Sequence, residues 1–280
     1  MFRANVSNWV DGVTTSVTGV YAMTVHDNGT GPALYIGTGN TGSGSDGDIW
    51  KSTNGVTWSR IYHASEYKIN ILASIDGVLY MGGSRPSGTG RFVRFTNDTW
   101  MIESAASRPV KTIEKYGGVI YYTSSNVLHS YDTETALSPT VSTIGGGTEA
   151  NDVDSMRAFS GRLYASHTHS TIERLANTTD PTTWIYEEIT DRPFAQNMRI
   201  LSDGYMYLAL AKLNDAKIWR KTPAGVSESI LELGVNSDTG SEYDRTVDVV
   251  EFNGRKYVGV VDRFGTSGTN RLGYMFKLTN

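Results

Sequence analysis

The chain has 280 residues, a formal net charge of −4 and no cysteine, which excludes disulfide bonds, thiolate metal sites and cysteine nucleophiles. A hydrophobic content of 39% predicts a folded chain, and the slight acidic excess leaves no basic footprint for nucleic acid. Thirty Gly against seven Pro, together with sixteen Tyr, is typical of short strands joined by many turns.

The N-terminal residues 1–12, MFRANVSNWVDG, have no long apolar run after Arg3. We therefore expect no signal peptide at this end of the sequence. No later segment is long and apolar enough to predict a membrane span.

Six copies of a Gly-x-x-Tyr pattern follow in chain order, the first with one extra residue. Their tyrosines are at positions 35, 80, 121, 164, 207 and 257, so the spacings are 45, 41, 43, 43 and 50 residues. A four-stranded propeller blade takes about 40–45 residues. The sequence therefore predicts six such blades.

Each copy has the same predicted order of strands. A short apolar strand such as INILASID (69–76) leads through a Gly-containing turn into the Tyr strand. An alternating third strand such as KIWRK (217–221) follows, and a fourth strand often opens with Trp, as in TWSRIY (57–62). Because the apolar period is two throughout, we predict an all-β fold, a six-bladed β-propeller of four-stranded antiparallel blades, as a single domain over 1–280.

The sixth copy ends after its third strand, GYMFKL (273–278), and is followed by Thr279-Asn280. In two earlier copies Thr-Asn leads on to a Trp. NVSNWVDG (5–12) contains Trp9, so we predict that this N-terminal strand completes the last blade and closes the ring, which removes exposed sheet edges. All six Trp are expected to have structural roles between blades.

KSTNGVTW (51–58) resembles the Asp-box, the Ser-x-Asp-x-Gly-x-Thr-Trp turn of sialidase-like and related propellers. The match covers Ser52, Gly55, Thr57 and Trp58, whereas Asn54 stands in place of Asp and the turn is one residue shorter. The resemblance implies a propeller built from degenerate Asp-box (BNR)-like repeats. It does not imply sialidase activity, because the Asp-box is a folding motif remote from catalysis.

The ligand face of a propeller usually forms where the loops before first strands meet those between second and third strands. Six residues in or beside these loops are our candidate ligand-binding residues: Arg85, Arg108, His167, Arg192, Tyr243 and Arg263. A sialidase-like glycosidase is one enzymatic alternative. Its candidate residues in these loops are the four Arg together with Asp152, Asp191 and Tyr243. The Arg-Ile-Pro stretch of that family is absent.

A second enzymatic alternative is a Ca²⁺-dependent hydrolase of the lactonase or phosphoesterase kind, because hard cations take six to eight oxygen ligands. Acidic and amide residues at first-strand starts are its candidate ligands: Glu149, Asn151, Asp152, Asp154, Asn197 and Asp244. His167 and His169, two apart on one strand, could also project to one face and bind a metal.

The favoured hypothesis is a non-catalytic binding or assembly protein without a cofactor. The Thr-, Ser-, Gly- and Tyr-rich, Cys-free composition resembles that of phage or other virion structural and receptor-binding proteins. We therefore expect a virion or extracellular location, with a cell-surface glycan or a protein in a larger assembly as partner.

Overall fold

The computed structural model describes residues 19–39, 47–64, 68–85, 87–96, 99–106, 108–135, 137–144, 153–169, 172–188, 194–211, 216–233, 243–264 and 270–278. These residues form strands and turns only. The chain divides into an N-terminal unit, Val6–Thr143, and a C-terminal unit, Ile144–Asn280 together with Met1–Asn5. The prediction of a single domain is not tested by this division.

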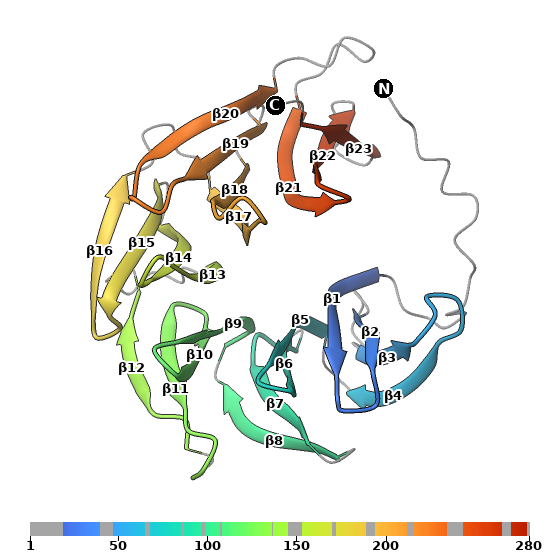
Figure 1. Ribbon diagram of the computed structural model, residues 1–280. Coiled ribbons are helices and arrows are strands. Elements are labelled where there is room, and N and C mark those ends of the chain that lie inside the picture. The colour runs from blue at the N-terminus through green and yellow to red at the C-terminus, as the bar shows by residue number, and fades with distance from the viewer. Residues whose placement is uncertain are drawn as a thin grey trace. The chain divides into compact units, whose positions relative to one another are not determined.

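The N-terminal unit contains three four-stranded antiparallel sheets, which we call blades 1 to 3 (Figure 1). Blade 1 has the order β1 (Gly19–Asp27), β2 (Pro32–Gly39), β3 (Gly47–Ser52), β4 (Ser59–Ala64). Blade 2 has the order β5 (Lys68–Ile75), β6 (Val78–Ser84), β7 (Gly90–Thr96), β8 (Thr99–Ala106). Blade 3 has the order β9 (Val110–Tyr116), β10 (Val119–Ser124), β11 (Val127–Tyr131), β12 (Thr140–Thr143).

The C-terminal unit contains blades 4 to 6. Blade 4 has the order β13 (Val153–Phe159), β14 (Arg162–His169), β15 (Ile172–Asp180), β16 (Thr183–Glu188). Blade 5 has the order β17 (Phe194–Ile200), β18 (Met206–Ala211), β19 (Ala216–Lys221), β20 (Ser227–Leu233). Blade 6 has three strands among the described residues, β21 (Tyr243–Phe252), β22 (Arg255–Phe264) and β23 (Asn270–Lys277), and one backbone pairing, Ala211 with Arg245, joins it to blade 5.

Six consecutive antiparallel sheets of this kind are the blades of a six-bladed β-propeller, so the predicted fold class is confirmed. The strand predicted over 5–12 lies outside the described residues. Ring closure through that strand stays a prediction.

The predicted Gly-containing turns join the first and second strands of most blades. At Asp76–Gly77 both residues have positive φ, 51° and 74°. This is the geometry of a type I′ hairpin, whose twist matches that of the strands it joins. Gly117–Gly118, Ser160–Gly161 and Asn253–Gly254 have positive φ at both positions as well.

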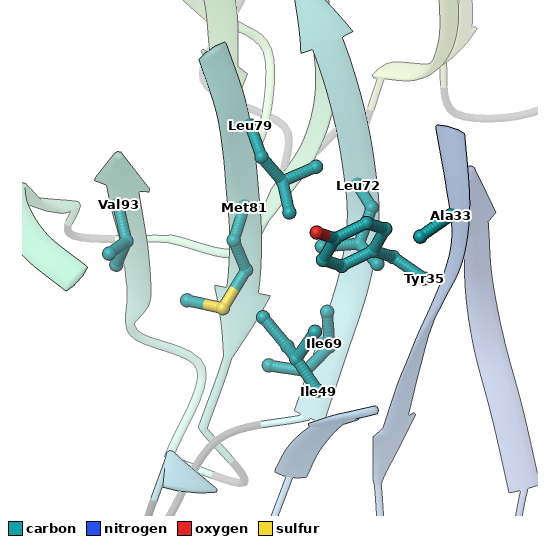
Figure 2. Close-up of a cluster of buried hydrophobic side chains, with 8 residues drawn as sticks. All are labelled: Ala33, Tyr35, Ile49, Ile69, Leu72, Leu79, Met81 and Val93. Atoms are coloured by element: carbon teal, nitrogen blue, oxygen red, sulfur yellow. The ribbon is translucent and has the colours of Figure 1, made fainter. Parts of the chain in front are cut away.

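Apolar side chains from neighbouring blades form the core of each unit. Between blades 1 and 2, Tyr35 and Ile49 point toward Ile69 and Leu72 of β5 (Figure 2). Equivalent clusters lie between blades 2 and 3, between blades 4 and 5 and between blades 5 and 6. Trp219 packs against the cluster between blades 4 and 5, in agreement with its predicted structural role.

The first strand of every blade contains a β-bulge near its start. In blade 3, Val110 pairs with Ser124 and Thr112 with Thr123, which leaves Lys111 as the extra residue. The extra residues in chain order are Tyr21, Asn70, Lys111, Asp154 and Gln196, and β21 has two, Asp244 and Val247. Bulges of this kind redirect a side chain and are common beside functional sites.

The side chain of Asn54 stabilises the turn between β3 and β4 by hydrogen bonds. Its Oδ1 accepts hydrogen bonds from the backbone N–H groups of Val56 and Thr57 at 2.9 and 2.8 Å. The Oγ of Ser52 accepts one from the N–H of Gly55 at 2.9 Å. An amide oxygen thus does here what an Asp carboxylate oxygen could do, although the Asp-box resemblance itself stays a prediction.

Asn54→Ala is expected to lower the free energy of unfolding by about 1 kcal/mol, because two backbone donors lose their acceptor at an exposed turn. Asn54→Asp keeps an oxygen at the same place and is expected to retain the stability of the natural protein. Urea denaturation of both variants measures the difference. Equal losses in the two variants would show that the Oδ1 hydrogen bonds contribute little.

Candidate functional site

In the N-terminal unit, loops before first strands meet loops between second and third strands of the preceding blade. A Cβ added to Gly90, at the start of β7, would lie 2.0 Å from the carbonyl oxygen of Arg108, which precedes β9. A Cβ added to Gly39, at the end of β2, would lie 2.4 Å from Cγ of Lys68, at the start of β5. We call this end of blades 1 to 3, marked by Gly39, Lys68, Gly90 and Arg108, the loop end.

Two of the predicted ligand residues lie at the loop end. The Arg108 side chain is exposed, while its backbone N–H donates to Oγ of Ser124 and its carbonyl accepts from the same hydroxyl, both at 3.2 Å. Arg85 is half-buried in a tight turn in which its N–H donates to the carbonyl of Thr89 at 2.8 Å. The contact of Gly90 with Arg108 brings these two loops together.

Three further polar residues gather at first-strand starts of the same unit. The Nζ of Lys68 lies 4.1 Å from the ring centroid of Tyr21, a cation–π contact. Asn70 donates from Nδ2 to the carbonyl of Val110 at 3.1 Å and so links blade 2 to blade 3. Tyr21 and Asn70 are both bulge residues, so the repeated bulge supplies polar groups to the loop end.

The electrostatics of the loop end centre on two lysines. Burial lowers the pKa of the Lys68 ammonium below its ordinary value, and the nearby positive charge of Lys111 lowers that pKa further. Both effects disfavour the charged form of Lys68. The Lys68 ammonium is therefore less favoured in this place than in water.

An acidic group with its own partners lies at the same end of blade 1. The carboxylate of Asp48 is buried, and its Oδ1 is 2.7 Å from Nδ1 of His63. Arg60 is 3.8 Å from the other carboxylate oxygen, and Oγ1 of Thr38 donates to the carbonyl of Asp48 at 3.1 Å. The side chain of Asp48 therefore has its polar partners within blade 1.

In the C-terminal unit, His167 is buried, with 1% of its surface exposed, and its ring makes an edge contact with Tyr186 at 5.6 Å between centroids. Tyr243 and Arg263 lie on the paired strands β21 and β22. Arg192 lies outside the described residues, as do Asp191, Glu149, Asn151 and Asp152. The ligand-binding roles of these residues, and those of Arg85 and Arg108, stay predictions.

The metal-site alternatives depend on several convergent ligands. Within the described ranges, no three His, Asp or Glu side chains come together in a group that could hold a metal ion. Asp154 and Asn197 lie on first strands of neighbouring blades, β13 and β17. Because Glu149, Asn151 and Asp152, three of the six Ca²⁺ candidates, lie outside the described residues, that alternative stays a prediction.

Sequence reasoning missed Tyr21, Lys68, Asn70 and Lys111. The alternation expected throughout each blade leaves no place for an extra residue in a first strand, so the bulges were not predicted. The available signal in the sequence was a change of phase: in INILASID the apolar residues Ile71 and Leu72 are adjacent, which strict alternation does not allow.

The comparisons with known proteins agree on the fold. No protein-family model matches this sequence, and no curated protein matches it. Among solved structures, the extracellular domain of a proposed one-component system of B. thetaiotaomicron is similar with a TM-score of 0.62 and 13% identity, over 92% of this chain and 33% of that one. This chain thus spans about a third of that protein's length.

Two further structures are similar over most of both chains. A protein from Lactobacillus plantarum has a TM-score of 0.60 and 11% identity, over 95% of this chain and 85% of that one. SapL1 lectin in complex with alpha methyl fucoside has a TM-score of 0.54 and 11% identity, over 93% and 94%. At such identities the similarity defines the class of protein, a β-propeller, and nothing finer.

None of the described residues belongs to a helix with the length and apolar character that a membrane span requires.

Proposed function

We propose that this protein is a non-catalytic binding propeller that recognises a glycan at the loop end of its N-terminal unit. The observation that carries the proposal is the fixed presentation of Arg108. Its backbone is held on both sides by Ser124 and packed against Gly90, while its side chain is exposed. Because the backbone of Arg108 is already fixed, only its side chain loses conformational entropy when this donor-rich group binds a ligand.

The neighbouring groups suit a sugar. Asn70 and Ser84, hydrogen-bonded to each other at 3.3 Å, provide amide and hydroxyl groups, and Tyr21 provides an aromatic ring. Sugars combine hydroxyl groups with apolar ring faces, so a site of this composition complements them. The Ser-, Thr-, Gly- and Tyr-rich composition supports a place outside the cell or on a virion, where receptor glycans are met.

The test is a binding screen of the full chain against immobilised glycans, followed by titration of the best ligand. Arg108→Ala is expected to weaken binding about 10-fold or more, because hydrogen bonds from a charged donor contribute about 1.5–3 kcal/mol. Arg255→Ala is the matched control, since Arg255 is an exposed arginine at the hairpin of blade 6.

The proposal fails if the natural protein retains no glycan in the screen, or if Arg108→Ala binds as tightly as Arg255→Ala. Retention of a protein from the native source, without any glycan, would favour an assembly role instead.

A further inference from the structure

We propose that His26 makes the contact between blades 1 and 2 sensitive to acid, so that the N-terminal unit contains a pH-sensitive interface. This inference goes beyond the proposed function and does not depend on it. A histidine is suited to such a role, because its imidazole changes charge in the mildly acidic range.

His26 lies between the two blades, near the end of β1. It is 2% exposed, and its Nδ1 lies 2.9 Å from Oγ of Ser74, near the end of β5. Its ring makes an edge contact with the ring of Tyr35 at 5.5 Å between centroids. The imidazole is therefore buried, and its hydrogen bond with Ser74 joins blade 1 to blade 2.

The packing around this contact leaves little room for water beside a charged ring. A Cβ added to Gly37 of β2 would lie 2.4 Å from Cγ2 of Ile69 in β5. Tyr35, whose ring His26 contacts, belongs to the same buried cluster as Ile69 and Leu72. A positive charge in such a place loses its hydration, so it is costly unless protein groups compensate it.

The charged groups nearest to His26 do not provide that compensation. The positive charge of Lys51 disfavours a protonated ring. The carboxylate of Asp27 favours one, but it is exposed, and its Oδ1 already accepts hydrogen bonds from the N–H groups of Gly29 and Gly31 at 2.8 and 3.0 Å. Within the described ranges, no carboxylate is hydrogen-bonded to the His26 ring.

The groups on the side of blade 2 do not favour the charged form either. Asp76, in the hairpin after β5, pairs with Lys115 of blade 3 at 2.6 Å. The hydroxyl of Ser74 can donate to a neutral imidazole or accept from a charged one, so it serves both forms. Burial is therefore the largest effect, and it lowers the pKa of His26 below the ordinary value of 6.5.

A histidine with a lowered pKa stabilises the folded state only while it is neutral. As the pH falls, the unfolded chain takes up this proton near pH 6.5, and the folded chain takes it up only at a lower pH. Between these two values the equilibrium constant for unfolding rises by at most about 10-fold per pH unit. The interface is therefore strongest above pH 6.5 and weakens below it. Tyr21 and Lys68, in contact at the loop end, come from the same two blades, so the weakening extends to the loop end.

The test follows the His26 ring by NMR of the full chain from about pH 8 to about pH 5, with its resonances assigned through the backbone. We expect a titration midpoint below 6.5. Hydrogen exchange of the β1 and β5 amides, corrected for intrinsic rates, should lose about 3-fold or more of its protection between about pH 7.5 and about pH 5.5. His26→Gln, which stays neutral, should lose less.

Two comparisons separate the charge from the other contributions at this interface. Burial lowers the pKa of His129 in blade 3 as well, but His129 is present in both proteins, so its effect cancels between the natural protein and His26→Gln. Ser74→Ala removes the hydrogen bond between the blades and keeps the imidazole. We expect this variant to lose protection at both pH values and to retain the pH dependence.

Three results would overturn the proposal: a midpoint of the His26 ring at or above 6.5, an equal acid-induced loss of protection in His26→Gln, or a loss of the pH dependence in Ser74→Ala. The last result would mean that the hydrogen bond, and not the buried charge, responds to acid. The ring titration of the natural protein decides the question even if the variants do not fold. None of these measurements involves a glycan, so their outcome is independent of the glycan screen.

Discussion

Replacement of Phe92 by Ala is expected to lower the free energy of unfolding by about 3–5 kcal/mol, because a fully buried aromatic ring leaves a cavity that its neighbours cannot fill. Phe92 is 0% exposed and stacks on Tyr122 with ring centroids 4.4 Å apart. Tyr131 makes an edge contact with it at 5.1 Å. The ring therefore joins β7 of blade 2 to β10 and β11 of blade 3.

The measurement is urea denaturation of the full chain, followed by circular dichroism and by intrinsic fluorescence. Phe252→Ala is the matched control, because that ring is 66% exposed, and its loss should change the free energy of unfolding by about 0.5 kcal/mol or less. A loss below about 1 kcal/mol for Phe92→Ala would mean that blades 2 and 3 are stabilised mainly by other contacts.

The sequence was sufficient to predict the blades because each blade repeats the same local physics. The tyrosines of the Gly-x-x-Tyr pattern include Tyr35, Tyr80 and Tyr164, which are buried between neighbouring blades. Turns such as Asp76–Gly77 must adopt positive φ, and few residue types do so readily. The repeated aromatic and turn positions can therefore be recognised in the sequence, although the residues between them differ from blade to blade.

The candidate site was only half predictable. Arg85 and Arg108 could be assigned to facing loops from strand order alone, and their loops do meet. Asn70 and Lys111 could not, because a bulge depends on pairing with the neighbouring strand and moves a polar residue out of the predicted alternation. Pairing register is a property of two strands, so one strand's sequence does not determine it.

Gly90 is a single position whose role could not be predicted from the sequence. Its substitution is the second large effect on stability that we expect. In the sequence it is one of several glycines in a polar loop. In the structure a methyl group there would lie 2.0 Å from the carbonyl oxygen and 2.9 Å from the carbonyl carbon of Arg108, both backbone atoms. Gly90→Ala must therefore move β7 or the segment before β9.

We expect Gly90→Ala to lower the free energy of unfolding by about 2–3 kcal/mol, the upper part of the usual range for overpacking, because the backbone atoms that it meets cannot rotate away. Glycan binding should weaken together with stability, because the displaced segment carries Arg108. Gly259→Ala is the control: its nearest added contact is 3.9 Å away, so its stability should stay within about 1 kcal/mol of the natural protein. If Gly90→Ala were as stable as Gly259→Ala and bound the same glycan equally well, the close approach of the two loops would not be what fixes Arg108.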